Sequence, residues 1–129
     1  MGNISLVTII LLLTLVAFLG WTAWRYYQVR KAAKFIDNAA FAELIHGGQL
    51  IDIREQSAYR MKHILGARNL PASQFNQSMS ALRKDKPVLL YDSSRSTSLP
   101  RVVLSLKKAG YTTIYVLKDG FDYWNGKVK

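Results

Sequence analysis

The longest hydrophobic pattern in the chain is an apolar run near its start. Residues 4–24 form 21 positions in which only Ser, Thr and Gly separate the apolar side chains, and no charged side chain precedes Arg25. A helix rises about 1.5 Å per residue, so the run spans roughly 30 Å, the thickness of the hydrocarbon core of a bilayer. Trp21 and Trp24 stand at its end, where aromatic side chains meet membrane surfaces. The pattern predicts a helix that crosses a lipid bilayer.

Basic side chains follow the apolar run at once, at Arg25, Arg30, Lys31 and Lys34. Because basic flanks favour the cytoplasmic side, we expect a single-pass protein of the cell membrane, with its N-terminus outside and its C-terminal domain in the cytoplasm. A cleaved signal peptide is the competing interpretation, and it needs a basic start and a small-residue cleavage site. Residues 1–3 carry no charged side chain, and Trp-Thr-Ala-Trp-Arg is a poor cleavage site, so we favour the anchor.

The remaining chain alternates between short apolar runs and segments with helical spacing. A continuous apolar run such as 87–91 is typical of a buried parallel strand, and alternation of strands with helices predicts an α/β fold with a mainly parallel central sheet flanked by helices. Asn38 and Ser98 are expected to cap helices, and Gly110 to end one. We expect strands at 34–37, 50–53, 87–91 and 111–117, and helices at 39–46, 56–62, within 71–82, at 98–109 and at 120–124.

All 18 Lys and Arg and all 8 Asp and Glu lie after residue 24, and the net charge is +10. The roughly 105 residues that follow the apolar run suffice for one compact domain. We therefore expect a transmembrane anchor with a juxtamembrane basic segment at 1–33 and one domain at 34–129. A basic domain suits nucleic acid, an anionic substrate or an anionic membrane surface. The adjoining helix favours the membrane, and no nucleic-acid-binding motif is present.

The chain contains no cysteine. This excludes disulfides, thiolate catalysis and cysteine-ligated metals from its own residues. The two histidines, His46 and His63, do not form a metal-ligand pattern, and His46 at a helix end suits a charge partner for that helix. We expect neither a metal site nor a cofactor.

Three separate stretches of the chain form one recognisable pattern. They are Leu-Ile-Asp-Ile-Arg-Glu at 50–55 with Tyr59 and His-Ile-Leu-Gly-Ala-Arg-Asn-Leu-Pro at 63–71; Lys-Pro-Val-Leu-Leu-Tyr at 86–91; and Leu-Lys-Lys-Ala-Gly-Tyr at 106–111 with Val-Leu-Lys-Asp-Gly-Phe-Asp-Tyr-Trp at 116–124. Together these stretches resemble the rhodanese family. The resemblance covers about residues 34–126, and the order and spacing of the stretches make it specific. It implies the rhodanese fold, with the site in the loop after the strand at 86–91.

Several residues of these motifs are expected to support the site rather than to react. Asp52 and Arg54 end a buried strand, where opposite charges can pair and bond to loop backbone. His63 is expected to hold the following turn through ring hydrogen bonds. Gly66 permits a turn, and Trp124 closes the core.

The resemblance implies a loop that reads C-x-x-G-x-R-S in active members, where the thiolate becomes a persulfide held by backbone N–H groups. In this chain Asp92 stands at the cysteine position, Arg95 at the glycine and Thr97 at the arginine, and only Ser98 is kept. A carboxylate cannot carry sulfane sulfur, so rhodanese chemistry is excluded. We expect Asp92 to fill the anion cradle itself, with a low pKa. The anion loop so defined is Asp92, Ser93, Ser94, Arg95, Ser96, Thr97 and Ser98.

The leading hypothesis is a non-catalytic binding or scaffolding module, held by residues 4–24 at the cytoplasmic membrane face beside a membrane-adjacent protein partner. No catalytic residue is assigned. One alternative is a divergent enzyme that uses the Asp92 loop on a phosphorylated or sulfur-containing anion, including Asp92 as the nucleophile of an acyl phosphate. Another is a docking partner in sulfur transfer.

Overall fold

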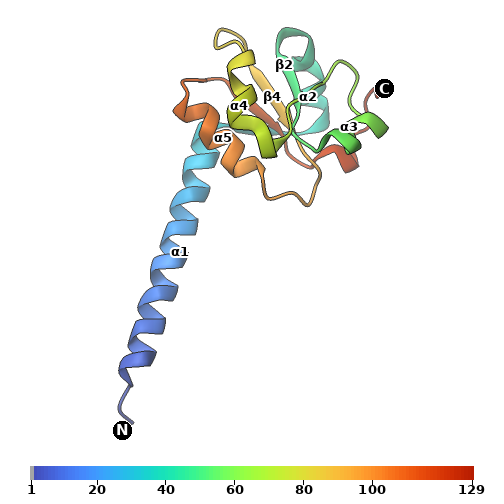
Figure 1. The fold of residues 1–129 in the computed structure, drawn as a ribbon. Helices are drawn as coiled ribbons and strands as arrows, with labels where there is room; N and C mark the ends of the chain where they lie inside the picture. The colour runs from blue at the N-terminus through green and yellow to red at the C-terminus, as the bar shows by residue number, and fades with distance from the viewer. Residues whose placement is uncertain (1) are drawn as a thin grey trace.

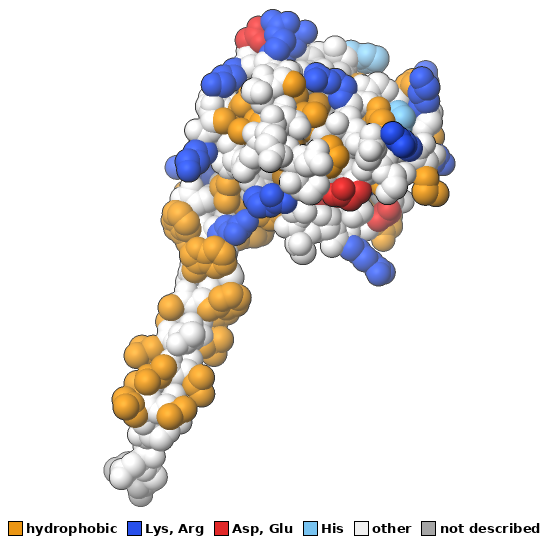
Figure 2. Space-filling model, viewed as in Figure 1, with side chains coloured by type: hydrophobic (Ala, Val, Ile, Leu, Met, Phe, Trp, Pro, Cys, Tyr) orange, Lys and Arg blue, Asp and Glu red, His pale blue; other side chains and the backbone are white. Residues whose placement is uncertain are grey.

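The computed structural model describes residues 2–129 and joins one long helix to an α/β domain (Figure 1). Helix α1 comprises Leu6–Ala32. Its N-cap is Ser5, whose side chain accepts the Thr8 N–H. It is the one helix of the described residues that is long and apolar enough to cross a membrane. Figure 2 shows apolar side chains along this helix, whereas Lys and Arg lie over the domain.

The domain is built on five parallel strands in the order β1-β5-β4-β2-β3. The central strands β2, β4 and β5 carry almost wholly buried side chains, as the continuous apolar runs predict. The α/β class and the parallel sheet are confirmed. The strands are β1 Lys34–Ile36, β2 Gln49–Asp52, β3 Arg68–Asn69, β4 Val88–Tyr91 and β5 Ile114–Leu117.

Helices cover both faces of this sheet and divide the core in two. Buried Val102, Val103 and Leu106 of α5 pack on one face, and Phe41 of α2 packs on the other. The helices are α2 Asn38–Leu44, α3 Gln56–Met61, α4 Phe75–Ser78 and α5 Leu99–Lys108, and the 3-10 turns are η1 Ile45–Gly47, η2 Ala72–Gln74, η3 Met79–Ala81 and η4 Phe121–Tyr123.

The last turns of α1 belong to the core of the domain. Val29, Ala32 and Ala33 are buried in the same cluster as the inward side chains of α5, and α1 lies against α5. Helix α1 therefore enters the domain without a flexible linker, and packing fixes the angle between them.

The segment 71–82 is not the single helix that the spacing of Phe75, Met79 and Leu82 predicts. It forms η2, α4 and η3 in succession. The Tyr111 hydroxyl bonds the carbonyls of Met79 (2.9 Å) and Leu82 (2.8 Å), which satisfies them without further helical turns. Tyr111 is buried in these contacts and lies outside the sheet, so β5 begins at Ile114 rather than at residue 111.

Of the two predicted helix caps, Asn38 is wrong, and Ser98 stands at the N-cap position without a side-chain bond. Asp37 caps α2, accepting the Ala40 N–H at 2.9 Å, while Asn38 donates to the Tyr123 carbonyl at 2.8 Å. Ser98 precedes α5, but its side chain makes no capping bond. At Asn38 a contact from outside the helix decides the role of the side chain.

Candidate functional site

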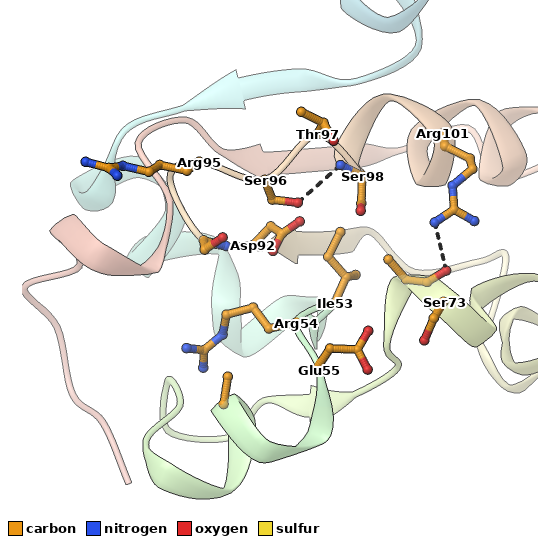
Figure 3. Close-up of a pocket in the computed structure, with 13 residues that line it drawn as sticks. Ile53, Arg54, Glu55, Ser73, Asp92, Arg95, Ser96, Thr97, Ser98 and Arg101 are labelled. Carbon is orange, nitrogen blue, oxygen red and sulfur yellow. Dashed lines mark hydrogen bonds between the residues drawn. The ribbon is translucent and has the colours of Figure 1, made fainter.

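The site lies where β2 and β4 end side by side. The parallel register pairs Asp52 with Tyr91, so the residues that follow each strand emerge at the same edge of the sheet. A cavity of about 530 Å³ opens there. All three of Asp92, Arg54 and Arg101 line it, and Figure 3 shows Asp92 and Arg54 toward one side and Arg101 toward the other.

Asp52 and Arg54 form the predicted ion pair, and Arg54 lines the cavity. The guanidinium reaches both carboxylate oxygens, with an Nη2–Oδ2 distance of 2.7 Å, and the Arg54 N–H donates to Oδ1 at 2.8 Å. Arg54 also donates to the Lys62 carbonyl at 2.7 Å and lies 4.0 Å from the Phe121 ring centroid. Asp52 neutralises the charge of Arg54, so Arg54 holds the lining of the cavity in place more than it attracts an anion.

His63 holds the preceding helix rather than the following turn. Its Nδ1 lies 2.7 Å from the Tyr59 carbonyl, and its ring stacks on Tyr59 with centroids 3.8 Å apart. The following turn is held instead by the Tyr59 hydroxyl, which donates to the Ala67 carbonyl at 2.6 Å. The role expected of His63 is therefore carried by its neighbour in the same motif. Trp124 does close the second core cluster, edge-on to Phe41 at 5.9 Å.

Asp92 directly follows β4, and only 4% of its surface is exposed. Oδ1 accepts the Ser93 N–H at 2.7 Å, whereas Oδ2 has no hydrogen-bond partner among the described residues. Burial raises the pKa of the Asp92 carboxyl, while the Ser96 hydroxyl and the Ser93 N–H oppose that rise. The expected low pKa is wrong, because the carboxylate takes one backbone N–H rather than a ring of them.

The loop after Asp92 is ordered by its own hydroxyls and by η4. Ser96 Oγ accepts the Ser98 N–H at 3.1 Å. The Ser94 N–H donates to Asp122 Oδ2 at 3.1 Å and its hydroxyl donates to the same oxygen, which lowers the pKa of Asp122. Of the seven predicted loop residues, Ser94 alone does not line the cavity.

Sequence reasoning missed several contributors to the site. Asp122 holds Ser94, and Arg101 donates to the Ala72 carbonyl at 3.2 Å beside the cavity. Asn69 bridges the carbonyls of Asp52 (3.0 Å) and Arg54 (2.9 Å). Asp122 and Asn69 belong to the family motifs, which was the signal that could have found them.

The chemistry available in the cavity is that of one buried carboxyl group among hydroxyls and guanidinium groups. Ser93, Ser96, Thr97 and Ser98 supply hydroxyls that can donate or accept. Within residues 2–129 no three His, Asp or Glu side chains gather closely enough to hold a metal ion. The arrangement suits hydrogen-bonded recognition of a small polar group, with Asp92 able to exchange a proton.

Comparison with known proteins shows which family has this fold and site. The model of the family described as "Rhodanese-like domain" matches residues 37–127. The chain belongs to the rhodanese-like domain family. The uncharacterized protein YqhL of Bacillus subtilis is 39% identical to this rhodanese-like chain over 120 residues, 93% of the chain and 94% of YqhL.

More distant rhodanese-like relatives match over a shorter part of the chain. The uncharacterized protein YibN of Escherichia coli K12 is 33% identical over 81 residues, covering 60% of this chain and 56% of YibN. The thiosulfate sulfurtransferase GlpE of Pseudomonas paraeruginosa is 28% identical over 81 residues, covering 61% of the chain and 71% of GlpE.

Solved structures confirm the rhodanese-like fold. A rhodanese-related protein of Thermoplasma volcanium superposes with a TM-score of 0.66 at 21% identity, covering 74% of this chain and 97% of that protein. The BH2092 protein of Bacillus halodurans gives a TM-score of 0.67 at 25% identity, covering 84% of each chain. A relative named as a thiosulfate sulfurtransferase is thus similar in sequence to this chain, which carries the buried Asp92 at the end of β4 and contains no cysteine.

Proposed function

We propose that the protein is a membrane-tethered, non-catalytic rhodanese-like domain that acts as a binding or scaffolding module at the cytoplasmic membrane face. The observation that carries the proposal is Asp92, a buried carboxyl group at the end of β4, in a chain without any thiol. A carboxylate has no sulfur to form the persulfide that rhodanese chemistry requires. The ordered loop around it remains available for recognition.

The exposed apolar surface of α1 supports the tether. Side chains from Leu6 to Leu19 are largely exposed around the whole helix, and water would not favour such a surface. Arg25, Arg30 and Lys31 follow at the domain end, which supports a cytoplasmic domain. Because the chain has no native thiol, single substitutions can report this topology. An impermeant maleimide should label Asn3→Cys in intact cells, and Thr112→Cys only after the membrane is opened.

The retained order of the cavity supports a binding role. Asp122 fixes Ser94, the Asp92 carbonyl accepts the Phe121 N–H at 2.9 Å, and Arg54 is held by Asp52. These contacts keep a shaped polar surface at the sheet edge without a nucleophilic thiol. A juxtamembrane protein partner is the occupant that this placement favours.

The experiment pairs loss of chemistry with its restoration. The full chain in detergent should show no transfer of sulfur from thiosulfate to cyanide, and Asp92→Cys, which places a thiol in the ordered loop, should introduce measurable transfer. Asp92→Ser is the matched control, because it changes the same position without a thiol. Transfer by the unaltered chain would contradict the proposal. A photo-crosslinking residue at exposed Thr97 should capture a membrane protein that the same residue at exposed Lys107 does not.

A divergent enzyme is the second candidate, and one observation favours it. Asp92 Oδ2 is buried, unpartnered within the described chain and beside the cavity, while burial raises the pKa of its carboxyl. Such a group can act as a proton donor or acceptor. Turnover of a phosphorylated or sulfur-containing anion that is lost in Asp92→Asn and retained in Ser93→Ala would favour this function over scaffolding.

A further inference from the structure

A second hollow lies where α1 meets the domain, away from the Asp92 cavity. It has a volume of about 200 Å³ and its surface is mostly apolar. Helix α5 supplies one wall through Pro100, at its first turn, and α1 supplies the rest. We call it the junction groove, lined by Thr22, Arg25, Tyr26, Val29, Arg30 and Pro100.

The junction groove lies at the level where the apolar run gives way to charge. Arg25 is the first charged residue of the chain, and Trp21 and Trp24 stand immediately before it. In the inserted protein this level coincides with the lipid headgroups. Pro100 comes from the domain, so the groove exists only while α5 is packed on α1.

Two arginines that line the groove, Arg25 and Arg30, have no carboxylate partner among the described residues. The ion pairs of these residues are Arg54–Asp52 and Arg83–Asp85, neither of which includes a residue of the groove. The Arg25 guanidinium lies 5.5 Å from the Trp21 ring centroid, and that of Arg30 lies 5.2 Å from the Tyr26 ring centroid. Trp21 comes four residues before Arg25, so the Arg25 side chain runs back along the helix toward the membrane. The Arg30 guanidinium also lies 4.2 Å from the Phe35 ring centroid, so it stands where α1 meets β1.

We propose that the junction groove binds one anionic phospholipid of the surrounding leaflet. The phosphate would lie between the guanidinium groups of Arg25 and Arg30, which offer several N–H donors each. The glycerol and first methylenes would pack on Val29 and Pro100, the apolar part of the groove. The lipid would thereby touch both α1 and α5. The inference rests on the proposed membrane insertion of α1.

The test uses the full chain in nanodiscs of phosphatidylcholine mixed with phosphatidylglycerol. Native mass spectrometry of the released protein measures the ratio of chains that retain phosphatidylglycerol to chains that retain phosphatidylcholine. A basic side chain near an anionic leaflet contributes about fivefold in affinity. The double variant Arg25→Gln/Arg30→Gln should therefore lower the ratio roughly 25-fold. Arg60→Gln/Arg68→Gln removes the same charge from exposed positions of the domain and should leave the ratio unchanged.

A third variant separates a built groove from diffuse attraction. Pro100→Trp keeps both arginines but fills the groove, and it should also lower the ratio. An unchanged ratio in Pro100→Trp, or in the double glutamine variant, would overturn the inference. Displacement of the lipid by an equal concentration of inorganic phosphate would assign the site to free phosphate and would also overturn it. If the unaltered chain fails to enter the discs, the membrane tether itself is contradicted, whereas an inserted chain without lipid preference contradicts the groove alone.

Discussion

A Cβ atom on Gly120 would lie 2.7 Å from the backbone nitrogen of Ser94. The backbone of Gly120 has a φ of +82°, which side chains other than hydrogen rarely allow. The loop after β4 and the turn after β5 thus touch backbone to backbone. This contact places Phe121 and Asp122 where they hold the Asp92 loop.

Gly120→Ala should destabilise the domain by on the order of 1–3 kcal/mol, because strain and overlap act at the same position. Thermal unfolding of the full chain in detergent, followed by circular dichroism, measures the change. Gly47→Ala is the matched control, since a Cβ there meets nothing within 4 Å. Equal stability of the two variants would show that the loop yields without cost.

Asp52→Asn should lower the free energy of unfolding by about 3–5 kcal/mol, because it removes one partner of a buried ion pair. The side chain of Asp52 is fully buried, and that of Arg54 is 11% exposed. Asp85→Asn breaks the exposed pair with Arg83 and should leave the free energy of unfolding nearly unchanged, because water screens that pair. Urea titration of both variants tests the contrast, and a loss in Asp52→Asn as small as that in Asp85→Asn would refute it.

The stability of the domain should depend on pH through Asp92 with an unusual sign. Its pKa is raised in the folded state above the ordinary 3.8, so the folded protein holds the proton more firmly than the unfolded chain. Stability from this group is present below pH 3.8 and is lost as the pH rises through the raised pKa. Asp92→Asn should therefore remove a decline in stability on the way from acid to neutral pH.

Asp122→Asn provides the opposite comparison for the pH experiment. Hydrogen bonds from Ser94 lower the pKa of Asp122, so its contribution is present above pH 3.8 and is lost as the pH falls through the lowered pKa. Urea midpoints measured across the acid range should change slope in opposite directions for the two variants. A parallel change would contradict the assignment for Asp92.

Val29→Ala should destabilise the domain by roughly 1–3 kcal/mol, although the residue lies in the long helix. Val29 is 5% exposed and packs in the core cluster with α5. Val16→Ala makes the same change where the side chain is 66% exposed, and it should leave the stability of the domain unaltered. Unfolding of the domain can be followed by the near-ultraviolet signal of its tyrosines. Identical unfolding of both variants would show that α1 is not part of the core.

The sequence predicted those parts of the fold that short-range patterns control. Apolar runs located β2 and β4 within about one residue, and the Asp52-Ile-Arg54 order predicted an ion pair that the structure has. The long apolar run likewise located most of α1. In each case the pattern itself carries the physical cause, namely burial of a strand or complementary charge two residues apart.

Long-range contacts decided the features that were missed. The Tyr111 hydroxyl divides the segment 71–82 from 29 or more residues away, and the Tyr123 carbonyl draws Asn38 from its expected cap. The pKa of Asp92 was misjudged for the same reason. Its environment depends on how η4 and the loop close over it, and no local pattern encodes that closure.

The burial of Val29 and Ala32 in the core cluster with α5 gives the domain a defined orientation relative to α1. A helix that is held upright by a bilayer transmits its own orientation to everything packed on its last turns. The loop between β4 and α5 lies on the side of the domain that faces the N-terminal end of α1 (Figure 1). If α1 spans a bilayer as proposed, a protein that diffuses beside it in the membrane would meet that loop at one height and would have only one rotation left to search. Much of the orientational entropy that binding normally costs would then already be lost. The rigid junction therefore limits how far the loop can move and fixes the direction in which it faces.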